Sequence, residues 1–120
     1  MAGLKERPGL LEALEQAVLA ESRPFLGICV GMQLLADRGE EYGAGAGLGW
    51  IGGAVEAFRP QDCAARVPHM GWSKIAIGSH HPVLEGAEGE MFYFAHSFSF
   101  SASHDQNVCA HTADGDNIVA

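Results

Sequence analysis

Hydrophobic residues between positions 9 and 21 recur at the three- and four-residue spacing of an amphipathic helix. The stripe consists of Leu10, Leu11, Leu14, Ala17 and Val18. Acidic residues occupy the other faces, and Pro8 suits the first helical turn, where its missing N–H would have no partner anyway. The pattern therefore predicts one helix over residues 9–21 that covers a sheet.

A short apolar run follows this helix after Pro24, a residue that cannot continue a helix. Residues 25–28 have the length of a buried strand, and the good helix formers after them predict a second helix over residues 30–38, ending at Gly39. Helix, tight loop and buried strand in this order favour a parallel sheet with helical crossovers. The expected fold class is therefore α/β.

The remainder of the chain alternates between turn signals and strand patterns. Residues 52–58 predict a weak strand, the aromatic-rich residues 90–100 a longer one, and residues 107–113 a third. An Asp-Gly pair within residues 114–117 favours a hairpin, from which residues 118–120 begin the returning strand.

Composition narrows the class of protein. The chain has 120 residues, enough for one small domain, and a net charge of -8, which argues against nucleic acid as a partner. No apolar run has the length of a membrane span, and the first six residues lack the pattern of a signal peptide. The three cysteines are too few for a disulfide framework, so we expect a cytoplasmic protein. They are Cys29, Cys63 and Cys109.

Two stretches invite ligand-binding interpretations that the residues do not favour. The glycine-rich residues 40–50 follow a helix end and lack a Gly-Lys-Ser/Thr sequence, so we interpret them as a flexible loop and not a phosphate site. The adjacent His80 and His81 begin a turn with a short helical piece over residues 80–86. They point in different directions on a regular backbone and have no third ligand at a suitable spacing, so we expect no metal.

Cys29 is the candidate for chemistry, because it is flanked as Gly27-Ile28-Cys29-Val30-Gly31. This is a thiol version of the nucleophile elbow, in which small residues let the chain turn sharply from strand to helix. The turn would lift the sulfur out at a helix N-terminus, whose dipole favours the thiolate, and would aim the N–H of Val30 at a forming oxyanion. A buried structural cysteine is the alternative.

Three segments resemble one family. Pro-Phe-Leu-Gly-Ile-Cys-Val-Gly-Met-Gln-Leu-Leu over residues 24–35 is similar to the nucleophile segment of class I (triad) glutamine amidotransferases. Residues 68–72, Pro-His-Met-Gly-Trp, and residues 93–98, Tyr-Phe-Ala-His-Ser-Phe, are most similar to the glutaminase subunits of imidazole glycerol phosphate synthases. The resemblance implies a flavodoxin-like fold with a parallel-rich sheet flanked by helices, incomplete at both ends.

The resemblance also implies roles for individual positions. Cys29 would be the nucleophile and the Val30 N–H an oxyanion donor, and further residues would bind glutamine: Gly31, Gln33, His96, Ser97 and Phe98. A second segment would face a cyclase partner, a (β/α)₈ barrel that receives the ammonia: Pro68, His69, Met70, Gly71 and Trp72. No cofactor is implied. Ser73 and Phe98 stand where the family has Asn and Tyr, so the family's amide and hydroxyl groups are missing at these two positions.

A cysteine nucleophile needs a base, usually a histidine that a carboxylate orients. The family takes both from a downstream His-Pro-Glu segment, and no His-x-Glu occurs here. The histidines present are His69, His80, His81, His96, His104 and His111; we expect none of them to serve, although His96 is the best placed. We therefore expect one truncated amidotransferase domain over residues 1–120 that is inactive alone. The alternatives are a docking subunit without glutaminase activity, or another cysteine hydrolase of the same fold.

Overall fold

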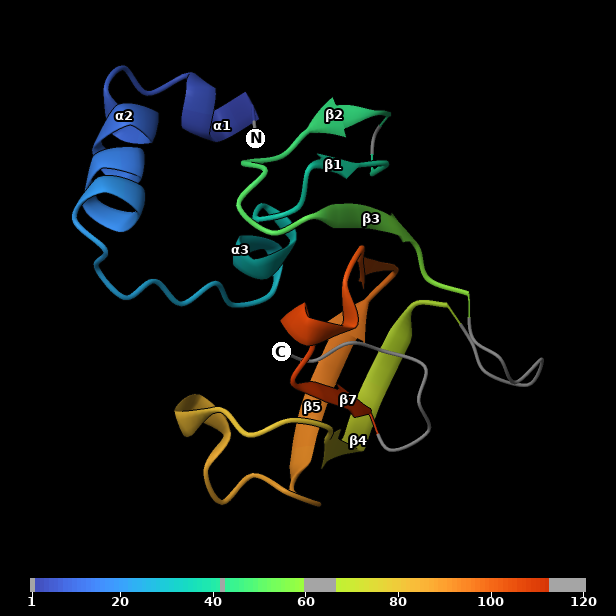
Figure 1. Cartoon of the computed structure of the whole chain (residues 1–120). Helices are drawn as coiled ribbons and strands as arrows, with labels where there is room; N and C mark the ends of the chain where they lie inside the picture. The colour runs from blue at the N-terminus through green and yellow to red at the C-terminus, as the bar shows by residue number, and fades with distance from the viewer. Residues whose placement is uncertain (1, 42, 60–66, 113–120) are drawn as a thin grey trace.

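The computed structural model describes residues 2–41, 43–59 and 67–112 (Figure 1). Its helices are α1 (Ala2–Lys5), α2 (Leu10–Glu15) and α3 (Val30–Gln33), with a π-helical stretch η1 (Gln16–Ala20) and 3₁₀ turns η2 (Pro82–Leu84) and η3 (Asp105–Asn107). The strands are β1 (Arg38–Gly39), β2 (Gly45–Ala46), β3 (Gly53–Ala57), β4 (His69–Ile77), β5 (Met91–His96), β6 (Phe98–Ala102) and β7 (Ala110–Thr112).

These strands form two sheets. The first has the order β2-β1-β3-β6, and the second has the order β5-β4-β7. Strands β1 and β3 pair in parallel, whereas the other four pairings are antiparallel. The α/β class holds, but the parallel-rich sheet does not appear among the described strands. Parallel neighbours need long crossover connections, and the short β1–β2 link of residues 40–44 closes as an antiparallel pair instead. The β4–β5 link of residues 78–90 is longer, and these strands also pair antiparallel.

The core of the first sheet lies between β3, β6 and the segment after α3. Ala36, Val55 and Phe100 are buried together, with Met32 and Phe98 packed against them. In the second sheet Ile75 is almost fully buried and lies opposite Thr112. The same β4 strand alternates between an inner face with His69, Ser73 and Ile75 and an outer face that stays exposed. This alternation is what a half-buried strand requires.

The predicted helix over residues 9–21 is present as α2 and η1, and all five residues of its apolar stripe are partly shielded from solvent. It begins one residue later, after Gly9 at a φ of 77°, and Pro8 lies ahead of it. The expectation that this helix covers a sheet is wrong. No residue of α2 or η1 is buried, and Figure 1 shows the helix set to one side of the strands.

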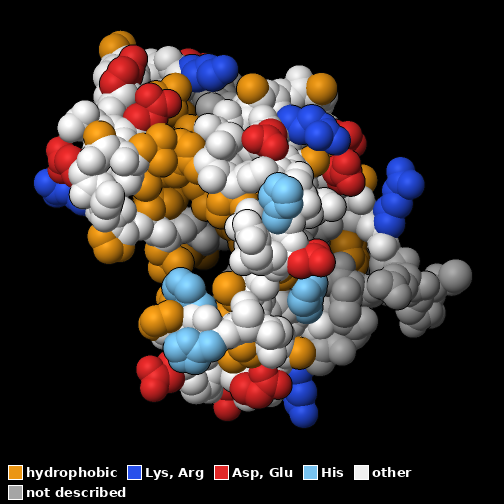
Figure 2. Space-filling view, in the orientation of Figure 1, with side chains coloured by type: hydrophobic (Ala, Val, Ile, Leu, Met, Phe, Trp, Pro, Cys, Tyr) orange, Lys and Arg blue, Asp and Glu red, His pale blue; other side chains and the backbone are white. Residues whose placement is uncertain are grey.

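The predicted buried strand over residues 25–28 is also wrong for this structure. The segment is extended but pairs with no described strand, and the exposed fractions of Leu26 and Ile28 are 66% and 74%. Both side chains line an apolar groove of about 370 Å³ that they share with β5. Figure 2 shows hydrophobic side chains gathered on the surface between the N-terminal helices and the strands. A run this apolar is buried only when strands or helices cover its edges and faces, and the described residues supply neither.

Two further boundaries differ from the prediction. Helix α3 ends at Gln33 and not at Arg38, because the chain turns at residues 34–37 and enters β1. The strand predicted over residues 90–100 is divided at Ser97 into β5 and β6, which belong to different sheets. The glycine loop 40–50 also contains the short strand β2.

The other predictions of elements are confirmed where they can be followed. Strand 52–58 is β3, the helical piece of residues 80–86 is η2, and the strand predicted over residues 107–113 is confined to β7, after η3. The hairpin at residues 114–117, the strand from residue 118 and Cys63 lie outside the described residues.

Gly53 is the glycine of β3 on which the pairing with β6 depends. Its φ is 148°, and an added Cβ would collide with the carbonyl oxygen of Ser101 and lie 3.0 Å from Cα of Ala102. We expect Gly53→Ala to lower the free energy of unfolding by about 2 kcal/mol, as overpacking at a rigid backbone contact does. Urea unfolding of the chain measures this, with Gly45→Ala as the matched control, because nothing lies within 4 Å of a Cβ added at Gly45. Equal stability of the two variants would contradict the prediction.

Candidate active site

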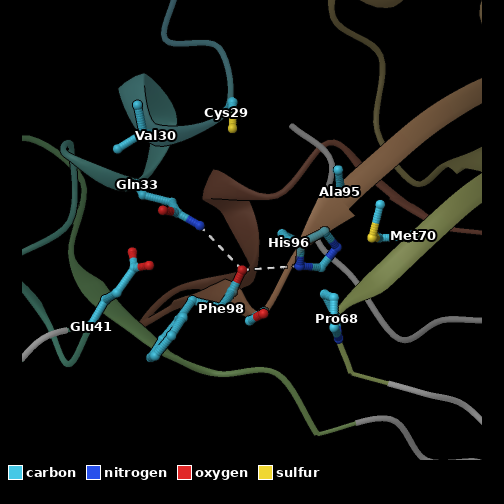
Figure 3. A pocket seen from close by; sticks show the side chains of 10 residues that line it. Cys29, Val30, Gln33, Glu41, Pro68, Met70, Ala95, His96 and Phe98 are labelled. Carbon is cyan, nitrogen blue, oxygen red and sulfur yellow. Dashed lines mark hydrogen bonds between the residues drawn. The ribbon is translucent and has the colours of Figure 1, made fainter.

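A cleft of about 420 Å³ lies where α3, the start of β4 and the junction of β5 and β6 meet (Figure 3). It is lined by Cys29, Val30, Gln33, Glu41, Pro68, Met70, Ala95, His96, Ser97 and Phe98. In Figure 3 the sulfur of Cys29 points from the start of α3 toward the interior of the cleft. Segments that are more than 60 residues apart in the chain (Gln33 and Phe98 are in hydrogen-bond contact) thus converge on one cavity.

Cys29 occupies a sharp, strained turn. Its φ of 55° and ψ of -119° lie in a region that non-glycine residues rarely adopt. The turn is closed by hydrogen bonds from the N–H of Gly31 to the carbonyl of Ile28 (2.9 Å) and from the N–H of Met32 to the carbonyl of Cys29 (3.0 Å). The predicted elbow is therefore present, although the segment that leads into it is not a paired strand.

Gly27 makes this turn possible by allowing a close approach of two backbone segments. An added Cβ at Gly27 would lie 2.8 Å from the carbonyl carbon and oxygen of Gly31 and from the nitrogen of Met32. A Cβ added at Gly31 would meet nothing within 4 Å. The glycine before the cysteine is thus required by packing, whereas the one after it is not explained by any contact.

Val30 is the first residue of α3, so its N–H has no acceptor within the helix. An N–H in that position, next to the sulfur, can donate to an oxyanion that forms on a bound carbonyl. Because α3 has four residues, the dipole invoked for the predicted nine-residue helix is reduced to that of a single turn.

The carbonyl oxygen of Phe98 organises the opposite wall of the cleft. Nε2 of Gln33 donates a hydrogen bond to it at 3.1 Å, and Nδ1 of His96 lies 3.0 Å from the same oxygen (Figure 3). Since a carbonyl can only accept, His96 carries a proton on Nδ1. Gln33 and His96 therefore hold the wall from α3 and β5.

The second ring nitrogen of His96 is also engaged. Its Nε2 lies 3.3 Å from Nδ1 of His69, the residue directly opposite on β4. Burial lowers the pKa of His96 below its ordinary value of 6.5, the Phe98 carbonyl partly opposes this, and the nearby His69 lowers the pKa further. Both nitrogens of His96 thus lie within hydrogen-bond distance of other groups, and the expectation that His96 is not the base stays a prediction.

The cleft assembles most of the residues singled out from the sequence. Every residue assigned to the nucleophile, oxyanion or glutamine site lines it except Gly31. Of the partner-facing segment, Pro68 and Met70 line it, whereas His69, Gly71 and Trp72 do not. Trp72 lies on the outer face of β4, where its indole ring packs edge-on against Tyr93 with ring centroids 5.6 Å apart.

Glu41 and Ala95 line the cleft but were not predicted to. Ala95 offers no chemical signal in the sequence. Glu41 does, because a carboxylate that follows a nucleophile helix is a candidate to bind a cationic group; its position depends on the β1–β2 connection, which sequence patterns did not reveal. Among the described residues no group of His, Cys, Asp and Glu is arranged to hold a metal, and no described helix is long and apolar enough to cross a membrane.

Comparison with known proteins assigns this arrangement to a family. Residues 3–120 match the family model described as glutamine amidotransferase class-I. The chain belongs to the class-I glutamine amidotransferase family. Membership supports the α/β, flavodoxin-like fold class that the resemblance implied, with sheets that are mixed among the described strands.

Relatives of this amidotransferase chain carry one common name. The imidazole glycerol phosphate synthase subunit HisH of Rhodospirillum rubrum is 54% identical over 98% of the chain and 56% of its own length. The subunit HisH of Zymomonas mobilis is 50% identical over 100% of the chain and 55% of its own length. That of Cereibacter sphaeroides is 48% identical over 93% and 53%. The amidotransferase chain thus spans about half the length of the curated relatives it matches.

The positive φ of Cys29 predicts a stability order for two substitutions. Cys29→Gly relieves the backbone strain and Cys29→Ala does not, so we expect the glycine variant to have a free energy of unfolding about 1 kcal/mol higher. Urea unfolding of both variants gives the difference. Ala46→Gly, an exposed strand position without positive φ, is the control and should lower stability. A glycine variant at Cys29 that is the less stable of the two would show that the turn is not strained.

Proposed function

We propose that this chain is the central part of the glutaminase subunit of an imidazole glycerol phosphate synthase and that Cys29 is its nucleophile. The observation that carries the proposal is the strained Cys29 turn at the edge of a cleft whose far wall is held by Gln33 and His96. The names of the relatives support the identity of the enzyme. The domain would extend over residues 1–120, and its site of action would be the cytoplasm.

The chemistry follows from the geometry of the cleft. The thiolate of Cys29 attacks the side-chain amide carbon of glutamine, and the carbonyl oxygen becomes an oxyanion that accepts a hydrogen bond from the Val30 N–H. The C–N bond breaks, and ammonia leaves after the nitrogen takes up the proton that a base outside the described residues has removed from the Cys29 thiol. Water then attacks the resulting glutamyl thioester, the C–S bond breaks, and glutamate is released with regeneration of the thiolate.

Substrate orientation is assigned to the walls of the cleft. Ser97 and Phe98 border the cavity opposite Cys29, and Gln33 and His96 keep the Phe98 carbonyl in place. Glu41 adds a carboxylate to the lining. Free glutamine carries an α-ammonium group, which a carboxylate at the cleft would bind by charge and hydrogen bonding. We therefore add Glu41 to the proposed glutamine-binding residues.

The outer face of the second sheet is the proposed docking surface for the cyclase partner. Met70, Trp72 and Tyr93 have exposed fractions of 63%, 65% and 55%, and they lie close together on β4 and β5. Aromatic residues and methionine are enriched at the centres of protein interfaces. Met70 also lines the cleft, so ammonia released there would leave next to the bound barrel.

A second candidate function is a docking subunit that does not hydrolyse glutamine. It is favoured by the engagement of both nitrogens of His96, the histidine that lines the cleft. Under either proposal the described residues supply no base for Cys29, and we propose that the 120-residue chain alone is inactive.

The first test measures glutamate release from glutamine. We expect none from the chain alone, because the residues that the structure describes supply no base for Cys29. A chimera that joins to this chain the flanking segments of the Rhodospirillum rubrum relative should release glutamate in the presence of its cyclase partner, and Cys29→Ala should abolish the release.

Each contrary outcome has a definite meaning. Cys29-dependent turnover by the chain alone would show that it contains a base and would overturn the proposed inactivity. A chimera that binds the cyclase but releases no glutamate would overturn the glutaminase proposal in favour of the docking subunit.

The second test concerns Glu41. In the chimera, Glu41→Gln should raise KM for glutamine about tenfold, which corresponds to about 1.4 kcal/mol, with little change in kcat, because the α-ammonium is bound equally in ground and transition states. Glu40→Gln is the matched control, since Glu40 is the neighbouring carboxylate and does not line the cleft. An unchanged KM in Glu41→Gln, or an equal rise in both variants, would remove Glu41 from the site.

A further inference from the structure

His69 and His96 form a hydrogen-bonded pair behind the wall of the cleft. They are direct cross-strand partners on β4 and β5, with Nδ1 of His69 3.3 Å from Nε2 of His96. This series of hydrogen-bond contacts extends from His96 to Phe98 and from His69 to Ser73. Nδ1 of His96 reaches the Phe98 carbonyl at 3.0 Å, and Nε2 of His69 lies 3.2 Å from Oγ of Ser73.

The acceptor at one end determines where the protons lie. The Phe98 carbonyl can only accept, so His96 has its proton on Nδ1, and its neutral form has a bare Nε2. The bare Nε2 requires a donor, which is Nδ1–H of His69. A neutral His69 then has a bare Nε2, which accepts the hydroxyl proton of Ser73. All three contacts are satisfied in a single direction, from Ser73 to the Phe98 carbonyl.

Aromatic packing holds the His69 ring in the orientation that these hydrogen bonds require. The ring stacks on Phe94 with centroids 5.3 Å apart and an interplanar angle of 6°, and on Phe58 at 5.9 Å and 25°. The ring of His96 packs edge-on against Phe58 at 5.2 Å. Rotation of either ring would break these stacks as well as the hydrogen bonds.

We propose that His69 is a positioning residue for glutamine binding: through His96 it orients the Phe98 carbonyl, and with Ser73 it connects strand β4 to the wall of the cleft. The effect of His69 on glutamine binding rests on the proposed function. The positions of the protons on His69 and His96 do not depend on it. His69 does not line the cleft, so its effect passes through His96 and not through contact with substrate.

The arrangement depends on a neutral His96. A proton on Nε2 would place that N–H against the Nδ1–H of His69, and two donors cannot share a hydrogen bond. The titratable groups that face His96 are His69 from β4, Cys29 at the start of α3 and Glu41 from the segment after β1, the last two across the cleft. The lowered pKa of His96, due chiefly to burial, agrees with a neutral ring near pH 7.

The pH dependence has a definite sign. Because the pKa of His96 is lower in the folded state than its ordinary 6.5, the unfolded chain binds more protons between those two values. The contribution of His96 to stability is therefore complete above pH 6.5 and is lost as the pH falls through the pKa of the folded state. Glutamine binding should weaken over the same range, because the opposed N–H groups of His69 and protonated His96 would displace the His96 ring from the position in which it orients the Phe98 carbonyl.

The experiment is NMR of the chain labelled with ¹⁵N in its histidine rings. We expect both His69 and His96 in the Nδ1–H form near pH 7, although free imidazole side chains in water favour Nε2–H. His69→Phe keeps the stacked ring and removes the hydrogen bonds; it should raise the pKa of His96, because the donor to Nε2 that favours the neutral form of His96 is lost. His69→Asn, whose amide can donate from the position of Nδ1, should leave His96 as in the original chain.

A smaller substitution tests the same hydrogen bonds in case His69→Phe does not fold. Ser73→Ala removes the hydroxyl that donates to His69, so the Nδ1–H population of His69 should fall while His96 keeps its proton on Nδ1. In the chimera with the cyclase, His69→Phe should raise KM for glutamine about tenfold and His69→Asn should not.

Two results would overturn the proposal: an Nε2–H form of His96 near pH 7, or a pKa of His96 that is the same in His69→Phe and the original chain. Neither depends on enzymatic activity. A chimera without glutaminase activity whose histidines nevertheless show the expected forms would reject the proposed function and leave the hydrogen-bond chain in place. An active chimera in which His69→Phe leaves KM unchanged would reject the positioning role alone.

Discussion

The change of sheet at Ser97 is the constraint on which the rest of the site depends. β5 ends at His96 and pairs with β4, whereas β6 begins at Phe98 and pairs with β3. The two successive carbonyl groups at this bend have different partners: that of Ser97 continues the β3–β6 ladder by one residue, whereas that of Phe98 lies outside the ladder at the edge of the sheet. The Ser97 carbonyl accepts the N–H of Phe58 at 2.8 Å, and the Phe98 carbonyl accepts Gln33 and His96. One irregular residue thus joins the two sheets to each other and joins both to α3.

The parts of the site that were predictable from sequence are those in which a few neighbouring residues determine the geometry. The Cys29 turn needs a glycine at position 27, where the backbone of residues 31 and 32 approaches, and a cysteine that can bear a positive φ. Both requirements are local and therefore visible in a short motif. Resemblance to a family then placed Gln33 and residues 96–98 at the same cleft, and the structure brings them together there.

The features that sequence reasoning missed depend on long-range pairing. Residues 90–100 have the aromatic content of one long strand, and only the competition between β4 and β3 as partners divides it at Ser97. Residues 25–28 have the apolar content of a buried strand, but burial depends on neighbours that the described residues do not provide. The proposed positioning role of His69 was missed for the same reason. Its partner His96 is identified by the register of two strands, which no local pattern fixes.

In a cysteine catalytic site, the nucleophile with its oxyanion donor and the base are positioned by different parts of the chain. The proposed nucleophile, Cys29, and the proposed oxyanion donor, the N–H of Val30, occupy adjacent positions, so one turn of backbone positions both. A base must come from another element and have a free nitrogen directed at the sulfur. His96 meets the first condition but not the second, because the Phe98 carbonyl and His69 occupy both of its nitrogens. If His96 gave up either contact to accept a proton from Cys29, the carbonyl that it orients would lose its donor, or the ring would lose its fixed proton position. The same side chain cannot hold the wall of the cleft and also exchange protons with the nucleophile. In the proposed glutaminase, this conflict, together with the absence of a base from the described lining, separates substrate positioning from proton transfer.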